Sequence, residues 1–221
     1  GISPGCFEFL PRGLTRFNPT SFSGSPSERQ WKALPQNLTE LTLYSMDGQN
    51  HFKFLPKKLR SLTFSHLEDL DDYPHLLKSL PRTVTYLDAW EEAFWGPGKI
   101  AWPEKLQHLA IGTSPGKDQT RSFPRGLKTL ILECEKIPKM ADLPYNLTKL
   151  ELTTQPLSDE HIFDLPPYLT SLDSPLNISQ RCWSLLPKTL KSVRIPAHGV
   201  GELEAHDIRS LVPPTCALIV D

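Results

Sequence analysis

The side chains that could do chemistry in this sequence are seven histidines, four cysteines and 25 acidic residues, and their spacing fits no catalytic or metal-binding pattern. The cysteines are scattered without a CxxC pair, which argues against a zinc site. The acidic stretch LEDLDDYPH lacks the glycine and the ligand spacing of an EF-hand. The sequence has no GxGxxG, P-loop, HExxH or nucleophile-elbow motif. We therefore predict a noncatalytic protein without a cofactor or a metal.

Composition narrows the class of partner and the environment. The 221 residues carry 24 basic and 25 acidic side chains, and this net charge of -1 gives no electrostatic reason to expect nucleic acid or an anionic membrane. No stretch approaches the ~20 apolar residues of a membrane span, and no signal peptide opens the chain. The scattered cysteines favour a reducing compartment such as the cytoplasm. A single Cys182–Cys216 bridge, a secreted protein and a cell-surface location stay open.

A phrase of apolar residues behind a proline recurs along the whole chain, and it decides the architecture. LPQNLTELTLYS begins at Leu34, and LPKKLRSLTFSH begins at Leu55. Apolar residues follow most of the prolines at offsets +3, +6 and +8. These prolines lie 20 to 26 residues apart, at Pro11, Pro35, Pro56, Pro81, Pro103, Pro124, Pro144, Pro166, Pro187 and Pro213.

The offsets predict one short strand in each repeat. Positions +6 and +8 differ by two, so on a strand their side chains share one face. The +3 residue enters the same core from the turn before the strand, and proline suits that turn because it has no N–H to donate. A strand of three to five residues that returns after ~21 residues can pair with the next strand only in parallel. Stacked repeats then share a core that no single repeat buries alone.

These residues carry a family resemblance. LxxLxL at this period resembles the leucine-rich repeat, and the proline before the first leucine resembles the short repeats of bacterial secreted effectors and the FNIP repeats of slime moulds. The resemblance implies an α/β-type repeat solenoid, a horseshoe with a parallel β-sheet on its concave face and mostly irregular or 3-10 convex segments. We predict a single domain over residues 1–221 with about ten repeats. Its parts are an atypical N-terminal unit at 1–33, regular repeats at 34–195 and a C-terminal capping unit at 196–221.

One position departs from the family pattern. The leucine-rich repeat normally has Asn at its ninth motif position, where the side-chain amides bond backbone groups along the array. This sequence has Asn there in only one of eight repeats, at Asn177. We therefore expect the backbone groups at this position to be satisfied in another way.

Exposed aromatic side chains indicate the candidate binding surface, because they are typical anchors of protein interfaces. The repeat with the insertion AWEEAFWGPGK supplies the predicted centre, formed by Tyr86, Asp88, Trp90 and the Phe94–Trp95 loop. The alternative is that the two tryptophans fold inward and fill the space beside Ala89. The full set of candidates is Tyr44, His66, Tyr86, Asp88, Trp90, Phe94, Trp95 and His108.

The sequence thus predicts a module that recognises a partner protein on its concave face and the adjacent rim loop. Two alternatives stay open: the recognition part of a larger effector enzyme, such as the ubiquitin ligases that carry this kind of repeat, and a secreted receptor for a glycan or a lipid. The latter would suit glycosylation of the NxS/T triplets at Asn37, Asn146 and Asn177, although two of these coincide with the repeat phrase itself. Nucleic-acid binding ranks last because acidic residues interrupt any basic stripe on the sheet.

Overall fold

The computed structural model describes most of the chain, which divides into two compact units, Gly1–Ile111 and Gly112–Asp221. For residues 44–46 and 65–67 it describes the backbone and not the side chains. The described residues are 3–19, 26–46, 51–67, 77–90, 100–112, 114–133, 135–195, 209–212 and 215–220.

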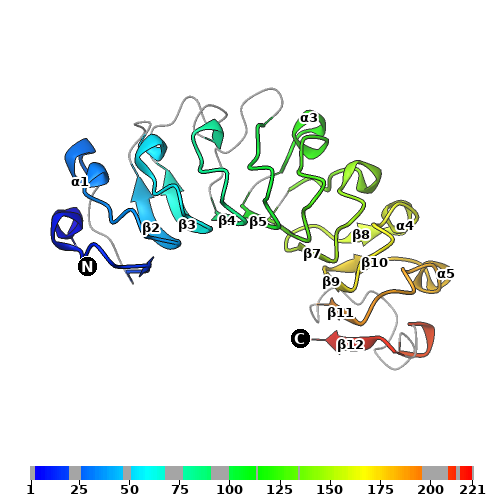
Figure 1. The fold of residues 1–221 in the computed structure, drawn as a ribbon. Helices are drawn as coiled ribbons and strands as arrows, with labels where there is room; N and C mark the ends of the chain where they lie inside the picture. The colour runs from blue at the N-terminus through cyan, green and yellow to red at the C-terminus, as the bar shows by residue number, and fades with distance from the viewer. Residues whose placement is uncertain are drawn as a thin grey trace. The chain divides into compact units, whose positions relative to one another are not determined.

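The first unit contains one parallel sheet with helical segments on one side of it (Figure 1). Its strands lie in chain order, and each pairs in parallel with the next. The strands are β1 (Arg16–Phe17), β2 (Glu40–Met46), β3 (Ser61–Leu67), β4 (Tyr86–Ala89) and β5 (His108–Ile111). Its helical segments include η1 (Pro4–Phe9), α1 (Glu28–Lys32) and η2 (Phe52–Phe54).

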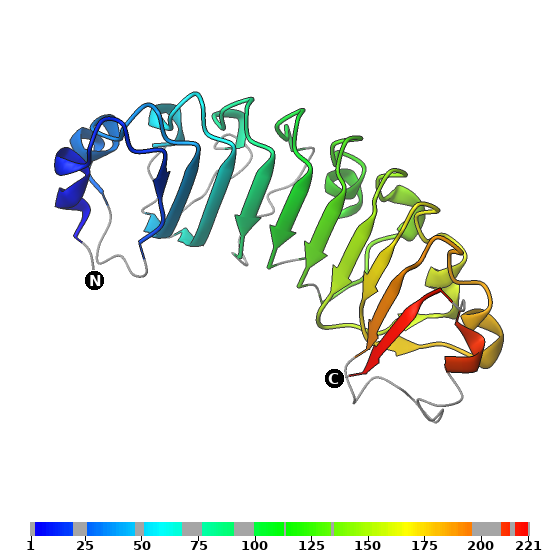
Figure 2. The same ribbon diagram turned by 60° about the horizontal axis from the view of Figure 1, so that its bottom comes forward.

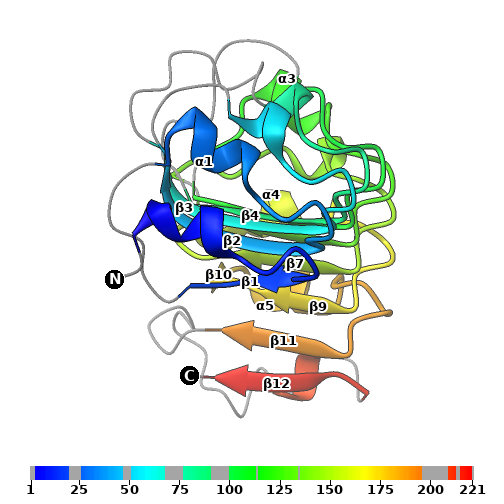
Figure 3. The same cartoon turned by 60° about the vertical axis from the view of Figure 1, so that its left-hand side comes forward.

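The second unit repeats this plan, and Figure 2 shows its strands as a row of arrows that point the same way. The described strands of this unit pair in parallel, including the last two strands, which lie side by side in Figure 3. The strands are β6 (Thr129–Leu132), β7 (Lys149–Leu152), β9 (Ser171–Asp173), β11 (Ser192–Ile195) and β12 (Ala217–Val220). Its helical segments include α3 (Lys117–Thr120), η3 (Met140–Asp142), α4 (Asp159–Ile162) and α5 (Gln180–Trp183).

The leucines of the repeat phrase form the core, and they lie in register from strand to strand. Leu41, Leu62 and Leu87 are Cα partners at offset +6 in the first unit. Leu130, Leu150 and Leu172 are the matching partners in the second. None of these six side chains is more than 1% exposed. The predictions of parallel strands and of a shared leucine core are therefore confirmed.

The turn before each strand explains the place of proline in the phrase. In every turn from Pro11 to Pro187 the proline carbonyl accepts a hydrogen bond from the backbone N–H three residues later, as between Pro56 and Leu59 at 3.0 Å. Proline suits this place because the turn needs its carbonyl and not an N–H. The residue before the proline is also buried, for example Leu34 and Leu165. The core thus extends one position further than offsets +3, +6 and +8 predict.

Threonine hydroxyls link neighbouring repeats along the turns. Thr148 Oγ1 donates to the carbonyl of Lys128 at 3.0 Å, and Thr170 Oγ1 donates to the carbonyl of Thr148 at 3.0 Å. Two positions earlier in their repeats, Thr83 and Thr189 donate to the carbonyls of Leu59 and Leu169 at 2.6 and 2.7 Å. The carbonyls of Lys128 and Thr148 also accept backbone N–H groups from the next repeat, so the threonine hydroxyls reinforce these links between repeats. Threonine is therefore a structural residue at these positions and not only a residue that suits a solvated strand.

Several local expectations need correction. Strands β2 and β3 are seven residues long and not three to five, because their pairing continues as far as Met46 and Leu67. A second, two-stranded parallel sheet joins β8 (Leu157–Ser158) to β10 (Leu176–Asn177), and it contains the ninth-position Asn. Cys182 and Cys216 are both free, so the bridge between them is not formed.

Candidate functional site

The structure describes the side chains of four of the eight predicted site residues. Tyr86 and Asp88 lie on β4, Trp90 follows that strand directly, and His108 begins β5. Tyr44 and His66 lie on β2 and β3, but their side chains are outside what the structure describes. Phe94 and Trp95 lie outside the described residues.

Tyr86 and His108 form a stacked pair on the outward face of the first unit's sheet, meaning the face opposite the leucine core. They are Cα partners in the parallel pairing of β4 with β5. Their ring centroids are 4.0 Å apart and their planes differ by 5°. Both side chains are half-buried, while the alternating residues Leu87 and Leu109 are in the core. Register therefore produces the stack, because partners on parallel strands lie ~4.8 Å apart.

Asp88 lies on the same face, two residues beyond Tyr86, and its carboxylate is held against aromatic groups. The phenol of Tyr86 donates to Asp88 Oδ2 at 3.4 Å. Burial raises the pKa of Asp88 above its usual range, and hydrogen bonds from Tyr86 and Trp90 oppose this shift without cancelling it. Burial together with the charge of Asp88 also raises the pKa of Tyr86. The site thus keeps a carboxylate partly desolvated, an arrangement typical of functional surfaces.

The substitution Asp88→Asn is expected to stabilise the protein at neutral pH. The amide keeps an oxygen for the Tyr86 phenol but has no charge to desolvate. The gain stays below ~1 kcal/mol because solvent reaches the half-buried carboxylate. Because the native state binds the Asp88 proton more tightly than the unfolded chain does, its stability falls as pH rises from the ordinary aspartate pKa of ~3.9 through the raised pKa. The stability advantage of the Asn variant therefore grows over the same pH range. Urea unfolding at acidic and neutral pH measures it. The exposed Asp164→Asn serves as control, and equal effects of the two changes at neutral pH would contradict the prediction.

Trp90 lies at the surface and not in the leucine core. Its side chain is 36% exposed, and its backbone N–H donates to the Phe64 carbonyl at 3.4 Å. Ala89 before it is fully buried on the opposite, core face of β4. The face formed by Tyr86, Asp88, Trp90 and His108 is called the aromatic face below.

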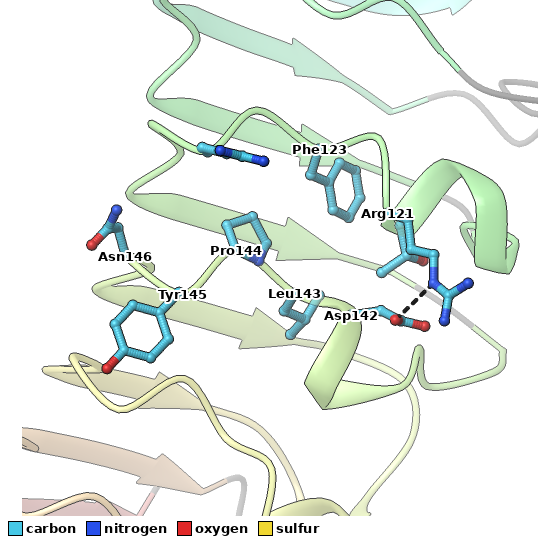
Figure 4. A pocket seen from close by; sticks show the side chains of 9 residues that line it. Arg121, Phe123, Asp142, Leu143, Pro144, Tyr145 and Asn146 are labelled. Carbon is cyan, nitrogen blue, oxygen red and sulfur yellow. Dashed lines mark hydrogen bonds and ion pairs between the residues drawn. The ribbon is translucent and has the colours of Figure 1, made fainter.

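The second unit has a pocket that the sequence did not predict (Figure 4). Its volume is about 290 Å³. Phe123, Leu143 and Pro144 supply its apolar lining. At one end Arg121 Nε pairs with Asp142 Oδ1 at 2.9 Å, and Tyr145 and Asn146 lie at the other end. The pocket arises because consecutive connecting segments run beside one another before β6 and β7.

Two exposed tyrosines beside this pocket are also missing from the predicted site. Tyr145 is 63% exposed and Tyr168 is 51% exposed. Their rings pack edge to face with centroids 5.2 Å apart, and a hydrogen bond with Tyr168 raises the pKa of Tyr145. Both follow the repeat proline by one or two residues. The sequence signal was therefore available, since turn residues between a proline and the next core leucine face solvent.

One serine–histidine contact in the second unit resembles the start of a catalytic arrangement. Ser158 Oγ lies 2.8 Å from His161 Nδ1. The same nitrogen accepts the backbone N–H of Ser158 at 3.0 Å, and the two residues cap the start of α4. The contact is therefore explained as a capping box, in which each residue satisfies a backbone donor of the other.

The described residues include neither a cluster of metal-ligating side chains nor a membrane-spanning helix. Among them, no group of three or more His, Cys, Asp or Glu side chains is arranged to hold a metal ion. Over the same part of the chain, none of the helices has the length and apolar character that a membrane span requires.

Comparison with known proteins supports the architecture. No family model and no curated protein matches the chain. Among solved structures, CroV588, a circular leucine-rich-repeat protein, matches 97% of this chain with a TM-score of 0.63 and 19% identity. The chain spans 35% of the length of CroV588. The leucine-rich-repeat protein LegL7 from Legionella pneumophila matches 98% of this chain and 86% of its own length, with a TM-score of 0.52 and 14% identity. Together with the in-register leucines, these matches show that the chain has the leucine-rich-repeat fold.

Proposed function

We propose that the chain is a noncatalytic protein-binding module whose partner docks on the aromatic face of the first unit. The observation that carries the proposal is the exposure of Trp90 beside the Tyr86–His108 stack. Exposed aromatic side chains that cluster on one surface are enriched at protein interfaces, where a few of them supply most of the binding energy.

The architecture supports this assignment because the described helical segments of the first unit lie on the side of the sheet away from the aromatic face (Figure 1). The outward side chains of β4 and β5 stand on paired strands, so their positions are fixed before a partner arrives. Such preorganisation lowers the entropy cost of association. A rigid row of aromatic and polar groups is thus presented to a partner at little cost.

Substitution of Trp90 by alanine tests the proposal directly. Loss of an interface tryptophan costs about 2 kcal/mol or more, which corresponds to a partner affinity about 30-fold weaker. The measurement is affinity capture from the native cell with the wild-type chain as bait, followed by titration of the recovered partner against both forms. Circular dichroism and urea unfolding verify that the variant folds.

Phe163→Ala provides the matched control, because Phe163 is 65% exposed and belongs to the other unit. We expect this variant to bind the partner as tightly as the wild type. If Trp90→Ala folds normally and binds the recovered partner with unchanged affinity, the aromatic face is not the docking surface.

A further inference from the structure

The basic side chains of this protein are concentrated on the turns before the strands. Across the ten repeats, offsets +1, +2 and +4 from the proline hold ten basic residues and one acidic residue, Glu104. The remaining positions carry 14 basic and 24 acidic side chains. Although the net charge is only -1, the positive charge is concentrated at these offsets and the excess negative charge lies elsewhere. The ten basic residues are Arg12, Lys57, Lys58, Arg60, Arg82, Lys105, Arg125, Lys128, Lys188 and Lys191.

All ten of these side chains are exposed. None of them forms an ion pair with another described residue, whereas Arg16, Arg121 and Lys149 at other positions are paired with carboxylates. Lys58 donates to Asn37 Oδ1 at 3.1 Å and Lys128 donates to the carbonyl of Asn146 at 3.5 Å, but both acceptors are neutral. Positive charge that no carboxylate neutralises raises the local potential and attracts anionic groups. The charge of the turns is therefore available to a ligand.

In the second unit these basic residues lie on both sides of the two exposed tyrosines. Arg125 and Lys128 lie in the turn before β6, and Lys188 and Lys191 lie in the turn before β11. Tyr145 and Tyr168 occupy the two turns between them, before β7 and β9. Neighbouring strands lie ~4.8 Å apart, so the row from the first basic pair to the last spans about 14 Å. These six residues are called the tyrosine edge.

We propose that the tyrosine edge binds an acidic peptide segment of a partner protein in an extended conformation. An extended chain advances ~3.3 Å per residue, so a stretch of about five residues covers the edge. Carboxylates near its ends pair with the basic side chains, and an apolar or aromatic residue in its middle packs on the tyrosines. Arginine and tyrosine are the residue types that dominate such contacts.

The pocket beside Tyr145 strengthens this proposal. Arg125, Tyr145 and Asn146 line it together with the apolar side chains of Phe123, Leu143 and Pro144 (Figure 4). An apolar side chain that enters the pocket would therefore leave its peptide backbone beside the basic turn residues. Pockets that combine an apolar lining with a few polar groups at the rim suit such an anchor.

A peptide fits this edge better than a nucleic acid does. Only four cations belong to the tyrosine edge, and a nucleic acid that releases about four counterions binds weakly at physiological salt. The edge lies in the second unit and shares no residue with the aromatic face, so its role does not depend on the proposed function.

Fluorescence anisotropy with the whole chain and a labelled peptide of sequence EEDFEDE tests the proposal. The same peptide with Gln and Asn in place of its acids, a ten-nucleotide oligouridylate and phosphatidylserine vesicles form the comparison arms. We expect the acidic peptide to bind most tightly, and its affinity to fall as salt is raised because exposed ion pairs are screened.

Two charge-reversal variants locate the site. Arg125→Glu combined with Lys128→Glu is expected to weaken peptide binding about tenfold, since each exposed ion pair contributes modestly and each reversal adds repulsion. Lys136→Glu combined with Lys139→Glu makes the same change in net charge at exposed positions outside the edge, and it should alter affinity less than about twofold. Replacing both tyrosines of the edge by alanine should weaken binding about fivefold without altering charge. Circular dichroism confirms folding of each variant.

Three outcomes overturn the proposal. The first is equal weakening by both charge-reversal pairs, which would show attraction by net charge alone. The second is tighter binding of the oligouridylate or the vesicles than of the peptide. The third is no peptide binding at concentrations up to ~1 mM, the limit of weak recognition.

Discussion

Leu150→Ala is expected to lower the free energy of unfolding by about 3 kcal/mol, because it removes a fully buried side chain from a close-packed core. Leu150 has no exposed surface and lies in register between Leu130 on β6 and Leu172 on β9. The strands on both sides are fixed by backbone hydrogen bonds, so they cannot collapse into the space that the leucine leaves. Urea denaturation followed by circular dichroism measures the loss.

The neighbouring residue supplies the control for this prediction. Lys149→Ala changes the same strand on its outward face and removes an ion pair to Glu151 at 2.9 Å. Because the lysine side chain is 40% exposed, its ion pair contributes at most ~1 kcal/mol. A Lys149→Ala effect as large as that of Leu150→Ala would mean that the leucine column does not supply the stability of the second unit.

Trp31→Ala is expected to lower the free energy of unfolding by about 3–5 kcal/mol, the range found when buried aromatic residues are replaced by alanine. Trp31 is fully buried in α1, where it closes the end of the first unit. Its ring packs edge to face on Phe7 at 6.0 Å and stacks on His51 at 5.7 Å. These contacts cover the core beside β1, which terminal repeats must shield from water. Thermal and urea unfolding of the variant measure the loss.

Two further substitutions separate packing from other effects. Among the described residues, the indole nitrogen of Trp31 has no hydrogen-bond partner, so Trp31→Phe should cost much less than Trp31→Ala. Phe9→Ala removes an aromatic ring that is 85% exposed in the same region, and its effect should stay within about 0.5 kcal/mol. If Phe9→Ala destabilises the protein as much as Trp31→Ala, the buried ring is not what closes the unit.

The leucine register was predictable from the sequence because one offset rule holds in nearly every repeat. Leu41, Leu62 and Leu87 occupy offset +6, and a period of two places each beside its equivalent on the next strand. Parallel pairing followed from the return of the phrase after one connecting segment. These features depend on the spacing of apolar residues and on the burial that this spacing implies, and both can be derived from the sequence.

Other parts of the fold depend on contacts between repeats that spacing does not reveal. Thr189 is chemically ordinary in the sequence, and only the carbonyl of Leu169 nearby makes its hydroxyl structural. Lys136 donates its backbone N–H to Ser114 Oγ one repeat earlier, at 3.0 Å. Ser114 occupies the ninth position of its repeat, so its hydroxyl is one way in which a backbone group there is satisfied without Asn. Such partners are set by how connecting segments of different length lie together.

The candidate surfaces were predictable to different degrees. The alternation of β4 placed Tyr86 and Asp88 on one face, but the 4.0 Å stack of Tyr86 on His108 required the register with β5. The predicted site omits Tyr145 and Tyr168 because it draws on positions between and after the leucines, whereas the turn before the first leucine is equally exposed. Their edge-to-face contact joins two turns that are 23 residues apart in sequence.

The spacing of 20 to 26 residues between prolines varies while the strands keep one register. The length of the segment between consecutive strands therefore varies while the register of the paired strands does not. Evolution can lengthen, shorten or exchange such a segment without disturbing the strands that carry a docking surface. Different parts of each repeat therefore serve stability and recognition, so one of these properties can change in evolution while the other is preserved. The same separation offers a protein engineer positions where foreign segments can be grafted.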